Sequence, residues 1–213
     1  MPVGPRWRAG AAVLILTLMA GTAGCAGDAR SESSSEPTNA ASADTTPAPP
    51  AEPTADVLVP LSPSTPVRLR IPAIGVDSAL MGLGLQGDGS LEVPPKGFPA
   101  GWYTGAPTPG ALGPAIIAGH VDWDGSPGVF FSLRDLAPGD TITVEREDGT
   151  AARFRVDSVQ QFAKDAFPTD AVYADIDHAG LRLITCGGSF DRDARSYRDN
   201  IVVFADLAGV DQL

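Results

Sequence analysis

Apolar and polar residues alternate with a period of two in several short segments after residue 64, as expected for strands that place one face on a core. The alternation is clearest at 67–71 and 181–185 and weaker at 76–80 and 90–93, which flank a Gly87-Asp88-Gly89 turn signal. Two short, wholly apolar runs have the length of buried strands. We therefore expect strands at 67–71, 76–80, 90–93, 115–118, 181–185 and 201–204.

A β-hairpin is the most secure local prediction. Residues 141–145 and 152–156 alternate in pattern and flank the turn signal Asp148-Gly149. Helical signals are few: residues 129–136 and 170–174 could each form one or two turns. Because strands dominate and Gly and Pro recur at short intervals, we expect a mostly β domain, folded as a largely antiparallel barrel or sandwich with one or two short helices.

Residues 1–25 have the layout of an export signal or membrane anchor. Arg6 and Arg8 precede an uncharged, largely apolar stretch that continues to Gly27. Thr22-Ala23-Gly24-Cys25 is similar to a lipobox, which makes Cys25 a candidate for lipidation, although Thr22 replaces the usual leucine. The alternatives are a lipid-anchored protein, an uncleaved bilayer-spanning anchor and a cleaved, secreted form. In all three, the remainder of the chain lies outside the cytoplasm.

Residues 26–63 form a predicted spacer between this segment and the folded domain. They are rich in Ser, Thr, Ala, Pro and Glu and contain no aromatic residue. Such a segment buries too little apolar surface to offset its chain entropy, and its prolines favour an extended conformation. We therefore expect a disordered spacer at 26–63 and a single domain at 64–213.

The charge of the domain argues against a nucleic-acid partner. From Ser64 onward, twenty acidic and twelve basic side chains give a net charge of −8 with neutral histidines. Solubility of an exported domain explains this acidity, so it identifies no substrate.

Cysteine usage gives the sharpest chemical hypothesis. Cys25 belongs to the export segment, so Cys186 has no partner for a disulfide within the domain. An unpaired thiol in an oxidising environment indicates either a reactive cysteine or a buried, inert one. Cys186 follows an expected strand and precedes Gly187-Gly188, where reagents could reach its side chain.

A catalytic thiol needs a nearby base and a cation, and the chain offers only two histidines. His120 follows an apolar strand and can lie at the same rim as Cys186. His178 lies one strand length from Cys186 and should be near the opposite end. If the strands at 181–185 and 201–204 pair in antiparallel fashion, Arg198 should approach Cys186. A polar residue at a strand end without a chemical role is the alternative for His120.

A metal site has weaker support. Asp122 and Asp124, or Asp175 and Asp177, supply oxygen ligands of the kind calcium prefers, but turn residues that bond their own backbone explain them better. One cysteine and two widely spaced histidines do not make a usual zinc set. We expect no metal site and leave calcium dependence open.

Several short motifs, in this order and spacing, resemble the sortase family. They are Arg70-Ile71-Pro72-Ala73-Ile74-Gly75-Val76, Gly101-Trp102-Tyr103, Ala118-Gly119-His120, Leu183-Ile184-Thr185-Cys186 and Tyr197-Arg198-Asp199-Asn200. The resemblance covers residues 66–207. The sequence from Cys186 to Asp191, with Arg198-Asp199-Asn200, is most similar to the class F sortases of actinobacteria.

The resemblance implies a closed eight-stranded barrel, no organic cofactor, and a cysteine transpeptidase at the cell surface. Cys186 would attack the Thr-Gly carbonyl of an LPXTG-like sorting signal, His120 would protonate the leaving amine, and Arg198 would steady the oxyanion or substrate. Thr185 is a secondary candidate for substrate contact. The implied partners are surface proteins bearing C-terminal sorting signals and an amine acceptor such as a cell-wall peptide. A sortase does not usually carry a lipobox, which favours the uncleaved anchor.

Two other functions remain open on the sequence. The same site could transfer the acyl group to water, which would make the protein a hydrolytic cysteine peptidase. Alternatively, Cys186 could be inert in a non-catalytic surface lipoprotein.

Overall fold

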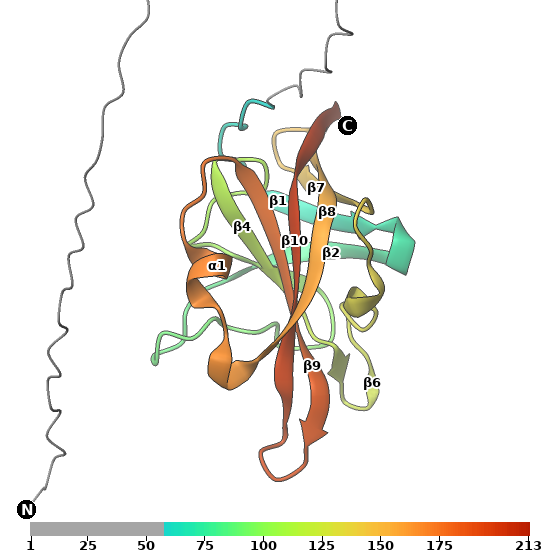
Figure 1. The fold of residues 1–213 in the computed structure, drawn as a ribbon. Coiled ribbons are helices and arrows are strands. Elements are labelled where there is room, and N and C mark those ends of the chain that lie inside the picture. Colours follow the sequence, from blue (N-terminus) through green and yellow to red (C-terminus); the bar gives the residue numbers. More distant parts are fainter. Residues whose placement is uncertain (1–57) are drawn as a thin grey trace, which may run out of the picture. The chain divides into compact units, whose positions relative to one another are not determined.

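The computed structural model describes residues 58–213, so the predicted export segment, Cys25 and most of the predicted spacer lie outside the described residues. Eight strands close into a barrel in the order β1-β2-β3-β4-β9-β10-β8-β7 (Figure 1). This confirms the mostly β, eight-stranded fold. The strands are β1 (Pro66–Ile71), β2 (Val76–Leu83), β3 (Ala100–Tyr103), β4 (Gly113–Ala118), β7 (Thr141–Arg146), β8 (Thr150–Ala163), β9 (Ala179–Asp191) and β10 (Ser196–Gln212).

Most neighbouring strands of the barrel are antiparallel, as expected, but β2 pairs with β3 and β4 pairs with β9 in parallel. A small hairpin of β5 (Asp122–Trp123) and β6 (Ser126–Pro127) lies outside the barrel. The described residues contain one α-helix, α1 (Thr169–Tyr173), and three 3₁₀ turns at Pro72–Ile74, Leu133–Asp135 and Lys164–Ala166. No helix within residues 58–213 is long and apolar enough to cross a bilayer.

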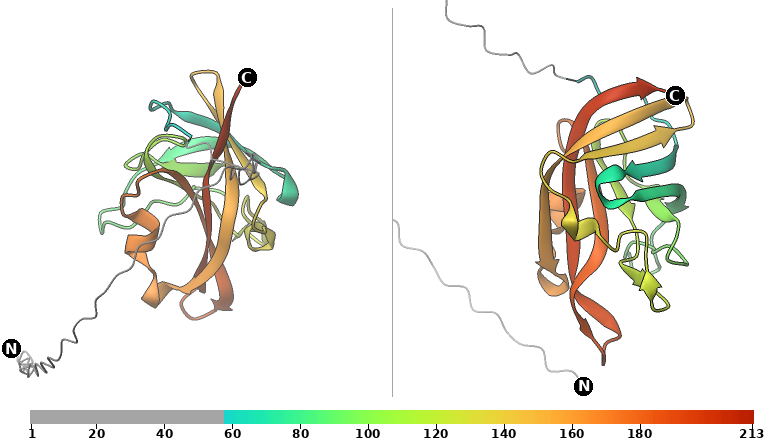
Figure 2. Two further views of the ribbon diagram at one scale, coloured as in Figure 1. Left: turned by 45° about the horizontal axis from the view of Figure 1, so that its top comes forward. Right: turned by 90° about the vertical axis from the view of Figure 1, so that its right-hand side faces the viewer.

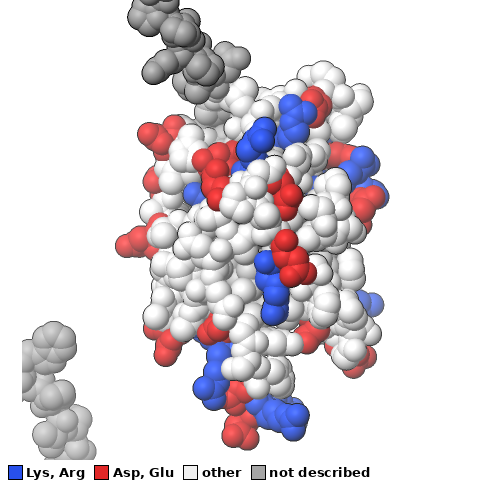
Figure 3. All heavy atoms as spheres, turned by 45° about the vertical axis from the view of Figure 1, so that its right-hand side comes forward, with Lys and Arg blue, Asp and Glu red and all other residues white. Residues whose placement is uncertain are grey.

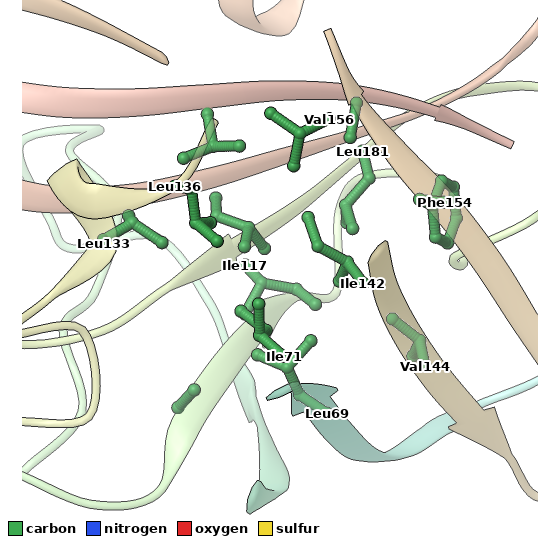
Figure 4. Packing of buried hydrophobic residues seen from close by; sticks show 14 of the residues in the cluster. Leu69, Ile71, Ile117, Leu133, Leu136, Ile142, Val144, Phe154, Val156 and Leu181 are labelled. Atoms are coloured by element: carbon green, nitrogen blue, oxygen red, sulfur yellow. The ribbon is translucent and has the colours of Figure 1, made fainter. Parts of the chain in front are cut away.

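The barrel interior is filled by the inward-facing apolar residues of its strands, as Figure 4 shows. Alternation places Leu69 and Ile71 of β1 and Ile142 and Val144 of β7 on the inner face, where all four are fully buried. Phe130 and Leu133, from the segment after β6, join the same core. The predicted hairpin of β7 and β8 is confirmed, with Ile142 opposite Phe154.

A second, smaller apolar cluster covers the outer face of β4. Ile116 of β4, Ile184 of β9 and Val202 of β10 pack with Val172 of α1, which lies beside β4 in Figure 1. Because Ile117 faces the barrel interior while Ile116 faces α1, every residue of β4 is buried. This double coverage explains why 115–118 is apolar throughout rather than alternating.

Three strands extend well beyond their predicted bounds. Strands β8, β9 and β10 run the length of the domain, and β9 and β10 end in a long hairpin at one tip (Figures 1 and 2). The expected strand at 90–93 is wrong, because only a single bridge joins Leu85 to Leu91. Pro94 and Pro95 follow at once and cannot donate to a strand ladder.

The last residues assigned to the spacer lie against the barrel. The Leu61 amide donates to the Gly110 carbonyl at 2.7 Å, and the buried Arg146 guanidinium donates to the Ser62 carbonyl. The segment that packs on the domain therefore begins a few residues before the predicted boundary at residue 64.

Acidic and basic side chains lie interspersed on the face shown in Figure 3, without a large region of one sign. Charged residues of both signs also gather at the tip formed by the β9–β10 hairpin. The net negative charge is thus spread over this face, in keeping with a role in solubility.

Candidate active site

The end of the pairing between β4 and β9 brings His120 and Cys186 to one rim of the barrel. The two strands are parallel neighbours, and their paired register ends at Ala118 and Ile184. The Gly119 amide then donates to the Ile184 carbonyl at 3.0 Å. His120 and Cys186 follow this last hydrogen bond by one and two residues. Parallel pairing therefore places both residues at the same edge of the barrel.

Both residues line a groove of about 860 Å³ on the outside of the barrel. Its floor comes from β4 and β9, and its walls come from the segment between β2 and β3 and from the region of α1. The lining is mostly apolar, with few charged groups. The lining residues include Leu85, Leu91, Glu92, Val93, Pro94, Tyr103, Ile116, His120, Lys164, Phe167, Tyr173, Asp175, Ile184, Thr185, Cys186 and Asn200.

His120 is held on two sides. Its Nε2 lies 2.7 Å from the Pro94 carbonyl oxygen, and its ring lies 4.8 Å from the Trp123 ring, centroid to centroid. Since a carbonyl oxygen only accepts, Nε2 carries the proton in this contact. The ring must turn, or the Pro94 segment must move, before Nε2 can donate to another group.

Cys186 is a free, half-buried cysteine. Its strand continues beyond it, but β4 no longer pairs there, so the thiol faces the groove instead of another strand. The Lys164 ammonium lies 3.6 Å from the Cys186 Sγ and 2.9 Å from the Ser196 Oγ. A cation in contact with the sulfur favours the thiolate, which is the nucleophilic form of cysteine.

Arg198 lies two residues before Asn200, which pairs with Cys186, but it does not line the groove. Strands β9 and β10 are antiparallel, and the residue opposite Cys186 is Asn200. The register shifts between Tyr197 and Asp199, and the Arg198 guanidinium binds Asp191 at 3.0 Å with its side chain 67% exposed. The structure thus places His120 and Cys186 together, while Arg198 in this conformation faces Asp191.

Backbone amides stabilise the charged form of Asp191, which binds the Arg198 guanidinium. The amides of Ala194 and Asp193 donate to its carboxylate at 3.1 and 3.0 Å, and these bonds, with the Arg198 contact, lower the pKa of Asp191. Asp191 is therefore a charged partner that holds Arg198 at the hairpin.

The two remaining polar candidates lie at different places. Thr185 lines the groove beside Cys186, and its buried Oγ1 has no hydrogen-bond partner among the described residues. His178 precedes β9, at the far end of the strand from Cys186, and contacts Asp177 and Asp206. It does not line the groove.

Two of the four carboxylates considered for calcium have other partners. Asp122 accepts a hydrogen bond from the Tyr197 hydroxyl, and Asp177 contacts His178. Within the part of the chain that the structure describes, no three His, Cys, Asp or Glu side chains are grouped as metal ligands would be.

Comparison with known proteins identifies the family. The family model for the sortase domain matches residues 69–208, which span β1 to β10 and include both His120 and Cys186. The chain belongs to the sortase family. This membership supports a transpeptidase activity in general. None of the functionally curated proteins compared with the chain matches it.

Solved sortase structures have the same fold. Sortase A from Corynebacterium diphtheriae, as a lid mutant, is 18% identical with a TM-score of 0.53 and covers 71% of this chain and 74% of its own. Sortase A from Listeria monocytogenes is 17% identical with a TM-score of 0.52, covering 71% and 92%. Sortase C-3 from Streptococcus pneumoniae is 16% identical with a TM-score of 0.54, covering 71% and 66%. These similarities confirm the sortase fold, and the class F assignment stays a prediction.

Three contacts of this sortase site were not predicted from the sequence: Lys164 with Cys186, Pro94 with His120, and Tyr197 with Asp122. Each joins residues at least 22 positions apart. Lys164 could have been noticed as one of only two lysines, but a single lysine after a strand carries no pattern of its own.

Proposed function

We propose that this sortase is a cysteine transpeptidase that cleaves an LPXTG-like sorting signal between Thr and Gly and transfers the acyl group to an amine. The observation that carries the proposal is the placement of the free Cys186 thiol and His120 in one groove of a sortase domain. An extracytoplasmic protein tethered through its N-terminus would meet both substrates at the cell surface.

In the first half-reaction, the Cys186 thiolate attacks the carbonyl carbon of the signal's threonine. The tetrahedral intermediate collapses as the carbon–nitrogen bond to glycine breaks, and the His120 imidazolium gives its proton to the departing amine. The product is a thioester on Cys186. Because the Nε2–H of His120 donates to the Pro94 carbonyl, proton transfer from Nε2 requires the segment around Pro94 to shift or the ring to turn.

In the second half-reaction, the nitrogen of the acceptor amine attacks the thioester carbonyl. The carbon–sulfur bond breaks, the thiolate is restored, and the amine's proton returns to His120. A cell-wall peptide is the expected acceptor. Arg198 would contribute by leaving Asp191 and steadying the substrate or the oxyanion.

The groove has the character expected for an extended peptide with apolar side chains. Exposed apolar residues such as Leu85 and Val93 line its wall. Thr185 offers an unpaired Oγ1 next to the nucleophile, which supports a role in binding the backbone of the signal. By the resemblance of the segment from Cys186 to Asn200, we assign the enzyme to class F.

The proposal is tested by incubating the protein with a panel of sorting-signal peptides and locating any adduct by mass spectrometry. We expect a thioester on Cys186 that is absent in Cys186→Ala and scarce in His120→Ala. His178→Ala is the matched control, because His178 lies outside the groove, and should acylate normally. No adduct across the panel would contradict the proposal and favour a non-catalytic binding protein.

Product analysis with and without an amine separates the transpeptidase from the hydrolytic peptidase. A transpeptidase gives an amide product that grows with amine concentration, whereas a hydrolase gives the free acid at a rate that the amine leaves unchanged. Arg198→Ala should lower the rate of acylation, and wild-type rates in this variant would remove Arg198 from the site.

A further inference from the structure

Lys164 occupies a fixed position beside the nucleophile. Strand β8 ends at Ala163, which pairs with Asp199 of β10, and the next residue of β10, Asn200, pairs with Cys186 on its other side. Asn200 also pairs with Phe162 of β8, so one row of paired residues runs from Phe162 through Asn200 to Cys186, and Lys164 follows Phe162 by two residues. The register of the barrel, rather than a free loop, sets how near the two residues lie.

The segment that carries Lys164 is also anchored by aromatic side chains on either side of it. Phe162 and Phe167 pack in the outer apolar cluster, with ring centroids 6.2 Å apart, and Phe167 lies 6.4 Å from Tyr173 of α1. The Lys164 Nζ then donates to the Ser196 Oγ at 2.9 Å. These contacts direct the ammonium toward the groove, although the residue itself is exposed.

Lys164 is the only lysine or arginine among the described residues that line the groove. Its Nζ is 3.6 Å from the Cys186 Sγ, whereas the Arg198 guanidinium is bound to Asp191 and lies outside the lining. The cation in contact with the sulfur is therefore Lys164.

We propose that Lys164 is a catalytic residue of this sortase whose ammonium stabilises the negative charge on the Cys186 thiolate and then on the oxyanion of the tetrahedral intermediate. The inference rests on the transpeptidase function proposed above. During attack, the charge moves from the sulfur to an oxygen attached to the neighbouring carbon, so a cation that touches the sulfur stays within reach of both atoms. Lys164 keeps its proton throughout and forms no bond to the substrate.

Other charged and titratable groups surround the thiol and must be considered with Lys164. His120 also lines the groove. The pKa of Tyr197 is raised mainly by its hydrogen bond to Asp122, and the charge of Cys186 adds to this shift. Asp199 follows Arg198 on β10 and accepts a hydrogen bond from Gln161. The carboxylates that line the groove are Glu92 and Asp175.

The direct test is the rate of Cys186 alkylation by iodoacetamide as a function of pH in the intact protein. In Lys164→Met the pH profile should move to higher pH by about half to one unit, so that alkylation at neutral pH slows by about threefold to tenfold. Lys164→Arg should restore most of the rate. Lys96→Met, which removes the only other lysine from a site outside the groove, should match the wild type.

The Ser196 hydroxyl gives a graded version of the same test. Ser196→Ala removes the 2.9 Å hydrogen bond that directs the ammonium, so it should shift the alkylation profile in the same direction by a smaller amount. A Lys164→Met profile that coincides with the wild type, with both proteins folded by circular dichroism, would overturn the proposal.

Alkylation needs no sorting peptide, so the two proposals fail separately. If the profile shifts while no peptide acylates the wild type, the transpeptidase function falls and the contact between Lys164 and the thiolate stands. If the wild type is acylated, Lys164→Met should lower the maximal rate of acylation about tenfold or more, with KM nearly unchanged. Equal maximal rates would overturn the role of Lys164 at the oxyanion.

Discussion

The Tyr197 hydroxyl donates a hydrogen bond to the Asp122 carboxylate, and this contact joins the β9–β10 hairpin to the loop that begins at His120. The bond is the main cause of the raised pKa of Tyr197, because the neighbouring carboxylate favours the protonated phenol. The Phe190 ring packs against Tyr197 with centroids 5.1 Å apart. The two segments that carry Cys186 and His120 are thus coupled directly.

Removing this bond should impair catalysis more than folding. Tyr197→Phe keeps the aromatic packing but loses the hydrogen bond, so we expect a loss of about 1 kcal/mol or less in stability. Acylation by a sorting peptide should slow about threefold to tenfold, because the two segments are held less accurately.

Asp122→Asn provides the matched change on the other side of the bond. Spectrophotometric titration of this variant should show one of the three tyrosines titrating at lower pH than in the wild type. The double variant should be no slower than the worse single variant. Additive losses in the double variant would show that the two residues act independently.

The groove wall offers a test of peptide binding that leaves the nucleophile untouched. Val93 is 61% exposed and lines the groove, so Val93→Ser should raise KM for a sorting peptide by about threefold to tenfold with little effect on stability. Val67→Ser is the control, because Val67 is 38% exposed on β1 and does not line the groove. Equal KM values for the two variants would place the peptide elsewhere.

Much of the barrel could be predicted because its local pattern agrees with its final environment. The strands around Leu69, Ile142 and Phe154 alternate cleanly, since one face meets the core and the other meets solvent. The outer half of β8 was missed because its last residues are only partly buried or exposed, and Ser158, Gln160 and Gln161 interrupt the apolar pattern around Val159 and Phe162. Pairing with β10, a long-range backbone interaction, makes that segment a strand.

The residues of the candidate site likewise fall into those that the sequence predicts and those that it does not. Cys186 and His120 could be chosen as candidates because each follows a predicted strand with an apolar pattern and lies in a family motif. Lys164 could not, because its distance from Cys186 depends on the register of three strands. The orientation of Arg198 toward Asp191 depends likewise on a register shift in β10 that no local pattern marks.

The loop from His120 to Phe130 is closed by backbone hydrogen bonds and leaves no room for a side chain at Gly128. A Cβ there would occupy the space of the His120 backbone carbonyl, and the Gly128 and Phe130 amides donate to the Val121 and His120 carbonyls. Gly128→Ala should therefore lower stability by about 1–3 kcal/mol and displace His120, reducing acylation about tenfold or more.

Urea unfolding and peptide acylation measured on the same samples check this prediction. Gly87→Ala is the control, because a Cβ at Gly87 meets open space and should leave both quantities nearly unchanged. A Gly128→Ala protein with wild-type acylation would show that the position of His120 does not depend on its close contact with Gly128.

His178 should make the stability of the folded domain depend on pH. Its Nδ1 lies 3.0 Å from Asp177 and its Nε2 lies 2.9 Å from Asp206. The hydrogen bond with Asp177 is the main cause that raises the pKa of His178 above its ordinary value of 6.5. A raised pKa means that the folded protein holds this proton more tightly than the unfolded chain does. The stabilisation is therefore complete below pH 6.5 and is lost as the pH rises through the folded value.

Urea unfolding at pH 6 and pH 8 measures this effect. The free energy of unfolding should fall more from pH 6 to pH 8 in the wild type than in His178→Gln. The difference should be below about 1 kcal/mol, because the side chain is 46% exposed and water screens its charge. His120→Gln is the matched control, since His120 is the only other histidine, and it should keep the wild-type difference. If His178→Gln keeps the full pH dependence and His120→Gln loses it, the stabilising proton belongs to the active site instead of to the Asp177–His178–Asp206 cluster.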